Sequence, residues 1–315
     1  MAQPQLIIVV GPTACGKTAL SLNIAQRLDC EIISGDSMQV YRGMDIGTAK
    51  LPPSARRGIA HHLLDIRDPD QAYSVADFRE DARQAIADID ARGKRSLLVG
   101  GSGLYINAVI NPYNFEQTTA QNDEIRAQLR REIAASGAEA LHQRLAEIDP
   151  EAAARIHAHD THRLIRALEV YMVSGRTISE MQRRSARPPD YRLLMLGLTM
   201  EREHLYRRIE QRVDEMLAQG LLDEVRGLLN GGLSIDAVSM QGLGYRQLAA
   251  YLSGRIDYPQ AVELIKRDTR RFAKRQFTWF KRDPRIKWFD LEHYRREGEA
   301  DTAVLEWLAR RLEEE

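Results

Sequence analysis

The chain has 315 residues, of which 43% are hydrophobic and 29% are charged, so it can bury a sizeable core as one large domain or two smaller ones. Its 45 Lys and Arg balance its 45 Asp and Glu, and composition alone therefore gives no sign of a nucleic-acid partner. The apolar run Leu6 to Val10 is too short for a signal peptide or a membrane span, which predicts a cytoplasmic protein with no membrane partner. The two cysteines support neither a disulfide framework nor a thiolate metal site.

Short apolar runs, most of them followed by Gly or polar turn residues, predict buried β-strands. The runs are Leu6–Val10, Glu31–Ser34, His61–Ile66, Ser96–Gly100 and Leu193–Thr199. Helix-period stretches such as 18–28 and 75–90 lie between the first four runs, which predicts an α/β fold with an open parallel sheet flanked by helices. Ligands of such a sheet bind at the carboxyl ends of its strands. Longer helices are expected at 202–219 and 258–280.

The alternation of strands and helices is interrupted in the middle of the chain. From about residue 122 to residue 184 the chain reads as helices with no clear strand, and Asp149-Pro150 places an Asp at a helix N-cap and a Pro at the first helical position. We therefore predict a helical domain at 118–190, inserted into a P-loop core formed by 1–117 and 191–315.

One motif predicts a phosphate site. The segment from Gly11 to Thr18 matches G-x-x-x-x-G-K-[ST] directly after an apolar strand and directly before a helix. In this motif the backbone N–H groups and the helix N-terminus bind phosphate, the lysine adds a full charge, and the last hydroxyl binds Mg²⁺. The motif predicts Mg²⁺ at Thr18, and its phosphate-binding residues are Gly11, Thr13, Ala14, Cys15, Gly16, Lys17 and Thr18.

The identity of the phosphate compound is left open by this motif. An ATPase or kinase usually carries an acidic residue after another apolar strand, but Ser96–Gly100 is followed by Gly101-Ser102-Gly103. Asp65 is the one substitute, and capping of a turn explains it equally well. Nucleotide hydrolysis therefore has weak support.

A carboxylate is expected beside the phosphate loop. Asp36 follows the second predicted strand and so lies on the same edge of the sheet as the loop. A carboxylate there can orient and deprotonate a nucleophile. An Asx turn or a helix N-cap accounts for an Asp at this position equally well.

A series of segments, in order along essentially the whole chain, resembles the signatures of bacterial tRNA dimethylallyltransferases. The segment from 34 to 50 is the most specific of them, and the phosphate loop alone would not be sufficient. The segments are Gly11–Thr18, Ser34–Lys50, His61–Ile66, Gly100–Tyr105, Arg163–Val170, Gly242–Arg246 and Ala273–Phe280.

The resemblance implies that the phosphate loop holds the diphosphate of dimethylallyl diphosphate and that no ATP is cleaved. Asp36 is then the general base that contacts the adenine amino group, and Thr13 lies near the bond that breaks. Arg208 and Arg212, which share one helical face, complete the diphosphate site. The alternative is that both arginines are solvated and pair with acidic neighbours at 201 or 215.

The resemblance also implies the acceptor, which is N6 of the adenosine adjacent to the 3′ side of the anticodon in tRNA. This base must be turned out of its loop, and the helical insertion would clamp the anticodon stem-loop. A monomer is expected. By the same correspondence the tRNA-binding residues are Asp36, Ser37, Met38, Gln39, Ser102, Arg126, His162, Arg163, Leu164, Ile165, Arg166, Gln241, Gly242, Leu243, Gly244, Tyr245, Arg246, Lys274 and Arg275.

Basic residues gather near the carboxyl terminus. Between 266 and 287 there are ten Lys or Arg against two Asp, and on a helix they form adjacent stripes. A solvated face explains such stripes equally well, and the resemblance favours a surface that contacts phosphates. Ile265, Phe272 and Trp279 fall on a different side, which we expect to face the core.

Three other functions are compatible with parts of the sequence. An adenylate isopentenyltransferase would use a free nucleotide as acceptor, but the helical insertion and the basic helix favour a larger one. A P-loop small-molecule kinase would turn over ATP. A catalytically silent tRNA-binding protein would not need Asp36 and the phosphate loop together.

Overall fold

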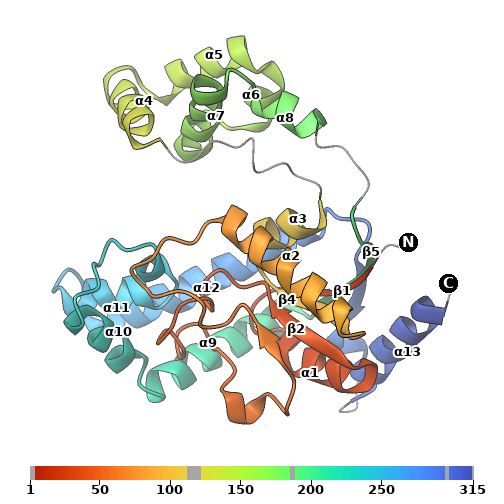
Figure 1. The fold of residues 1–315 in the computed structure, drawn as a ribbon. Helices are drawn as coiled ribbons and strands as arrows, with labels where there is room; N and C mark the ends of the chain where they lie inside the picture. Colours follow the sequence, from red (N-terminus) through yellow and green to blue (C-terminus); the bar gives the residue numbers. More distant parts are fainter. Residues whose placement is uncertain (1–3, 112–121, 185–188, 295–297, 314–315) are drawn as a thin grey trace. The chain divides into compact units, whose positions relative to one another are not determined.

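The computed structural model describes residues 4–111, 122–184, 189–294 and 298–313 (Figure 1). The chain divides into two compact units. The first contains residues 1–110 and 190–315, and the second contains residues 111–189. Within the described ranges, no helix is both long and apolar enough to cross a membrane.

The first unit is built on a six-stranded sheet in which all strand pairs are parallel, and the predicted α/β fold is confirmed. The strand order is β3-β2-β4-β1-β5-β6. The bounds are β1 (Gln5–Val10), β2 (Cys30–Ser34), β3 (His61–His62), β4 (Arg95–Gly100), β5 (Arg192–Thr199) and β6 (Lys287–Asp290). The central strand β1 thus lies between the strands that lead to the predicted acceptor loop and the predicted diphosphate arginines.

Helices cover both faces of this sheet, because successive side chains of a strand point to opposite faces and both sets are apolar. Leu6, Ile8 and Val10 of β1 join one hydrophobic core, whereas Ile7 and Val9 join another. The first core includes α2 (Val75–Ala91), α3 (Gly103–Ile110), α10 (Leu221–Asn230) and α11 (Tyr245–Leu252). The second includes α1 (Lys17–Leu28) and α13 (Glu299–Glu313), while both receive residues from α9 (Arg202–Ala218) and α12 (Tyr258–Phe280).

Two strands differ from the prediction. The run predicted at 61–66 forms a strand only at His61 and His62, because Leu63 and Asp65 adopt left-handed backbone conformations with φ of 62° and 56°. The short strand β6 was not predicted. It pairs with β5, and its Trp288 covers Gly197, where an added Cβ would lie 2.7 Å from the indole.

The second unit consists of helices in its described part, with a hydrophobic core of its own. Its helices are α4 (Asp123–Ser136), α5 (Ala138–Ile148), α6 (Pro150–Arg155), α7 (Thr161–Ser174) and α8 (Ile178–Arg184). The unit spans residues 111–189, whereas the sequence suggested 118–190, and residues 112–121 lie outside the described part.

Asp149 fixes the start of α6 as predicted and also reaches α8. Its Oδ1 accepts a hydrogen bond from the backbone N of Ala152 at 3.0 Å, and its Oδ2 accepts one from the backbone N of Ser179 at 3.0 Å. Burial raises the pKa of Asp149, but the hydrogen bonds from Ser179 and Ala152 outweigh it and hold the pKa below its usual value. The ionised carboxylate therefore stabilises the helical unit.

We expect Asp149→Ala to destabilise the helical unit by about 2–3 kcal/mol, because it removes a helix cap and leaves the buried Ser179 N–H without a partner. Amide hydrogen exchange of residues 150–184 in the full chain measures this loss. The pKa of Asp149 is lower in the folded than in the unfolded chain. The stability that Asp149 contributes is therefore fully present above about pH 4 and is lost as the pH falls further. Exchange in the variant as slow as in the wild type would contradict the assignment.

Candidate active site

Three predicted site segments meet at one edge of the sheet. The phosphate loop follows β1, Asp36 follows β2 and Ser102 follows β4, and these strands are neighbours in the order β2-β4-β1. Their ends are in close backbone contact, since Gly35 N donates to Val99 O at 2.7 Å and a Cβ on Gly100 would lie 2.5 Å from Gly35 O. The structure thus brings together the phosphate loop and the loops that carry Asp36 and Ser102.

The phosphate loop has the backbone of a phosphate cradle. Gly11, Ala14 and Gly16 have positive φ values of 146°, 64° and 96°, a feature of backbones that form anion-binding concavities. Lys17 Nζ donates to Gly11 O at 2.9 Å and to Pro12 O at 2.7 Å, so the ammonium lies against the loop. The Cys15 side chain is fully buried, and this residue offers the loop only its backbone.

Basic residues gather around this loop, with Asp36 as an acidic neighbour. Arg208 and Arg212 lie on α9, which follows β5; Arg208 is exposed and Arg212 is half-buried. Neither forms an ion pair with a carboxylate in the described residues, although the nearby Glu215 acts to raise the pKa of Arg212. The alternative interpretation is therefore right about the solvation of Arg208. Burial lowers the pKa of Arg212 and of Lys17, while Asp36 opposes both shifts. Because each cation also lies in the field of its neighbours, the group favours an incoming anion.

The Asx turn predicted at Asp36 is confirmed, and the role of this residue as a base stays a prediction. Its Oδ1 accepts a hydrogen bond from Met38 N at 2.9 Å, which is an Asx turn. Its other oxygen accepts none within the described chain. Gln39 supports the turn, because its side chain joins Ser34 Oγ at 2.9 Å to Thr48 O at 3.1 Å. Residues 36–39 are half-buried, as an acceptor pocket requires.

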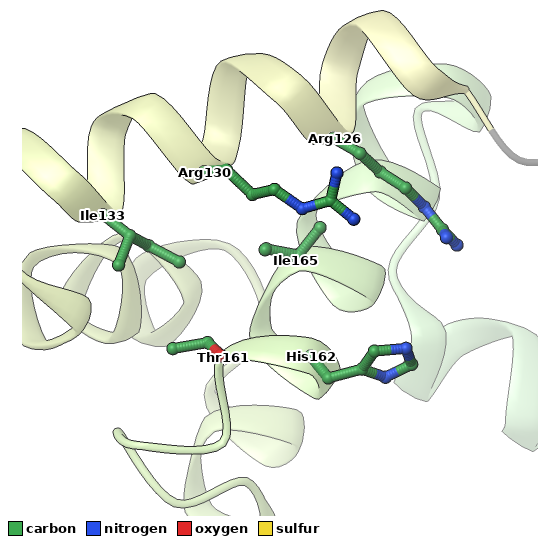
Figure 2. A pocket seen from close by; sticks show the side chains of 6 residues that line it. All are labelled: Arg126, Arg130, Ile133, Thr161, His162 and Ile165. Carbon is green, nitrogen blue, oxygen red and sulfur yellow. The ribbon is translucent and has the colours of Figure 1, made fainter. Parts of the chain in front are cut away.

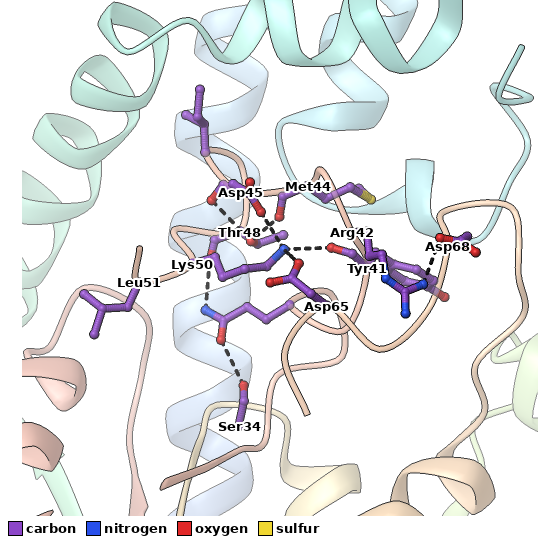
Figure 3. A network of polar contacts seen from close by, with 12 residues as sticks. Ser34, Tyr41, Arg42, Met44, Asp45, Thr48, Lys50, Leu51, Asp65 and Asp68 are labelled. Carbon is purple, nitrogen blue, oxygen red and sulfur yellow. Dashed lines mark hydrogen bonds and ion pairs between the residues drawn. The ribbon is translucent and has the colours of Figure 1, made fainter. Parts of the chain in front are cut away.

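A buried lysine holds the loop that follows (Figure 3). Lys50 Nζ lies 2.6 Å from Asp45 Oδ1 and 2.6 Å from Asp65 Oδ1, and it donates to Tyr41 O at 2.7 Å. The Lys50 side chain is only 3% exposed. Asp65 is therefore committed to supporting this loop.

Glu224 is a residue that sequence reasoning missed. Its carboxylate on α10 accepts the backbone N–H groups of Asp45, Ile46 and Gly47 at 2.9, 2.8 and 3.1 Å, and the Tyr245 hydroxyl at 2.6 Å. Burial, followed by the adjacent Glu224, raises the pKa of Tyr245, so its hydroxyl remains a donor. No motif surrounds Glu224, and only the folded chain reveals this contact.

The segment 241–246 divides between surface and interior. Gln241 and Arg246 are exposed, whereas Gly242, Gly244 and Tyr245 are buried and Leu243 is half-buried. Tyr245 thus supports the loop at 45–47, and its side chain is not available to a large ligand. Arg246 pairs with Asp268 at 2.9 Å.

Fewer basic residues of the stripes on α12 are free of acidic partners than the sequence predicts. Lys266 pairs with Asp214 at 2.7 Å and Arg270 with Glu210 at 2.6 Å, so acidic residues of α9 neutralise part of one stripe. Lys274 and Arg275 are exposed and have no carboxylate partner in the described chain. The expectation that Trp279 faces the core is wrong, because its side chain is 41% exposed.

The helical unit has a pocket of its own (Figure 2). It has a volume of about 220 Å³ and is lined by Arg126, Arg130, Ile133, Thr161, His162 and Ile165.

Arg126 and Arg166 are held by the fully buried Glu169, at 2.8 and 2.7 Å. Burial raises the pKa of Glu169, but the hydrogen bonds from Arg126, Asn122 and Arg166 hold it below its usual value.

Among the residues predicted to bind tRNA in this unit, some are exposed and others are buried. His162 and Arg163 are exposed, and Arg163 Nε is 3.4 Å from Asp160. The Leu164 side chain is completely buried and that of Ile165 nearly so. These two residues form the interior wall behind the exposed His162 and Arg163.

The parallel sheet with a phosphate loop between β1 and α1 defines a P-loop-type α/β protein. The sequence model described as IPP transferase matches residues 39–283. A tRNA dimethylallyltransferase of Carboxydothermus hydrogenoformans is 54% identical over 288 residues, which are 91% of this chain and 92% of that protein. One of Halalkalibacterium halodurans is 45% identical over 314 residues and 98% of both chains.

Solved structures agree with the sequence comparisons. The full-length tRNA isopentenylpyrophosphate transferase from Bacillus halodurans has a TM-score of 0.74 and 44% identity, over 98% of this chain and 97% of that one. A eukaryotic dimethylallyltransferase acting on tRNA has a TM-score of 0.81 and 27% identity, over 96% and 78%. The chain belongs to the IPP transferase family.

We expect Glu224→Ala to lower the free energy of unfolding by about 3 kcal/mol, because three backbone N–H groups and the Tyr245 hydroxyl lose a charged acceptor. Urea denaturation measures the change. Asp223→Ala is the matched control, since the neighbouring Asp223 is exposed and pairs only with Arg226. Equal effects of the two substitutions would show that Glu224 is an ordinary surface charge.

Proposed function

We propose that this protein transfers the dimethylallyl group of dimethylallyl diphosphate to N6 of the adenosine adjacent to the 3′ side of the tRNA anticodon, with release of diphosphate. The observation that carries the proposal is the juxtaposition of the cations Lys17 and Arg212 with Asp36 at one edge of the sheet. The names of its relatives, tRNA dimethylallyltransferases, support the acceptor.

The reaction suits these groups. The allylic C–O bond breaks as a bond from N6 to the allylic carbon forms, and the electron pair of the broken bond leaves with the diphosphate. Lys17, Arg208, Arg212 and the loop amides stabilise that departing charge. Asp36 orients the amino group and takes its proton, and Thr13 lies at the bond that breaks.

Mg²⁺ fits the phosphate loop through oxygen ligands. The described residues contain no group of three His, Cys, Asp or Glu that could hold a metal ion, but Mg²⁺ commonly binds through substrate phosphates with few protein ligands. The exposed Thr18 hydroxyl is the ligand that this chain offers. When bound, Mg²⁺ would neutralise charge on the diphosphate.

Basic residues in each unit, taken separately, support tRNA over a free nucleotide as the acceptor. The first unit offers Lys274 and Arg275 to a polyanion, and the pocket of the second unit offers Arg126 and Arg130. One copy of the chain supplies every residue of this scheme, so it requires no second subunit.

Asp36→Asn should reduce kcat for prenyl transfer by at least about 100-fold, because the amide cannot accept the proton. Labelled dimethylallyl diphosphate and Mg²⁺ are incubated with unmodified tRNA, with AMP, or with no acceptor. Label only in tRNA supports the proposal. Label in AMP would indicate an adenylate isopentenyltransferase, and ATP turnover without transfer would indicate a kinase.

Arg212→Gln should raise the KM for dimethylallyl diphosphate about 10- to 100-fold, because a partly buried cation at the diphosphate site is lost. The KM for tRNA should stay within twofold. Arg207→Gln on the exposed face of the same helix is the control and should behave as the wild type. A donor KM unchanged by Arg212→Gln would remove this residue from the proposed site.

A further inference from the structure

Gln276 connects the phosphate loop to the turn that carries Ser102. Its Oε1 accepts a hydrogen bond from Thr13 N at 2.8 Å, and its Nε2 donates one to Gly101 O at 3.1 Å. The side chain comes from α12 and is only 7% exposed. One carboxamide thus joins segments that follow β1 and β4.

The packing around this carboxamide is tight. A Cβ on Gly101 would lie 2.1 Å from Gln276 Nε2, so the turn can pass this close only because residue 101 is glycine. The same Cβ would lie 3.5 Å from Gly11 O of the phosphate loop. Gln276 therefore fills the space between the donor loop and the acceptor turn and leaves little freedom to either.

The chemistry of the contact is specific to glutamine. The contact needs an acceptor for Thr13 N–H and a donor for Gly101 O on one side chain of this length. An ionised glutamate has no donor and would repel the carbonyl oxygen. Asparagine is one methylene shorter, and methionine has a similar length but makes neither bond.

We propose that Gln276 is a positioning residue for the transfer reaction: it holds Thr13 N–H outside the cradle and so fixes Thr13 at the bond that breaks. This inference rests on the proposed function. The remaining loop amides and Lys17 still bind the diphosphate when Gln276 is replaced, so the effect falls on the reaction step. Misplacing a group at the reacting bond by about 1 Å can cost about 100-fold in rate.

The first test compares Gln276→Met with Gln84→Met, the same change at an exposed position of α2. For Gln276→Met we expect kcat to fall about 10- to 100-fold, with the KM for tRNA and its dissociation constant within twofold of the wild type. Gln84→Met should match the wild type. A kcat within twofold of the wild type in Gln276→Met, or a fall in tRNA affinity that accounts for the whole loss, would overturn the inference.

The second test uses Gln276→Glu and pH. A protonated glutamic acid has one donor and one acceptor, as glutamine does, so activity relative to the wild type should rise as the pH is lowered and the carboxyl protonates. A purely structural defect would give a constant ratio. A ratio that does not change between pH 8 and the acid limit of wild-type activity would contradict the role.

A third measurement does not depend on prenyl transfer. The hydrogen-exchange rate of the Thr13 amide should rise at least tenfold in Gln276→Met, while inorganic diphosphate should still bind, and exchange at the wild-type rate would overturn the inference. If the wild type bound diphosphate but transferred no prenyl group, the proposed function would fail, and this exchange rate would still decide whether Gln276 orders the loop.

Discussion

The close approach of backbones at the carboxyl ends of β2, β4 and β1 is the constraint on which the site depends. Gly35 and Gly100 leave no room for a side chain between their strands, so the loops for donor and acceptor emerge side by side. This arrangement destabilises the empty site electrostatically, because the cations Lys17 and Arg212 repel each other in a partly buried environment. Asp36 offsets part of this repulsion, and a bound diphosphate would offset far more.

Sequence was sufficient wherever a local pattern determined the structure. The phosphate loop, the strands β1, β2, β4 and β5 and the cap at Asp149 each follow from a few neighbouring residues, and family resemblance then joined them to one activity. Prediction failed at β3, where left-handed residues end the strand early, and at β6, whose four residues are too few to show a period.

The site was harder to predict where contacts join distant parts of the chain. Glu224 contacts a loop that lies 177–179 residues away in the sequence, and Gln276 contacts two segments that lie 175 and 263 residues away. Gln276 belongs to the signature segment Ala273–Phe280, but that segment does not indicate its partners. Helical spacing predicted that Trp279 lies on the same helix face as Ile265. On a straight helix, however, residues seven positions apart differ in direction by about 20°, and the difference grows with each further heptad. The tryptophan consequently emerges beside Gly103, with part of its indole exposed.

The contact between Gly47 and Tyr245 also restricts how this chain can change over time. A Cβ at 47 would lie 2.5 Å from the tyrosine ring, while the hydroxyl of that ring is bonded to Glu224. A lineage that enlarges residue 47 must therefore first reduce residue 245, and it then loses the hydroxyl that Glu224 binds. The three positions form an epistatic unit, in which each accepted substitution depends on the order of the others.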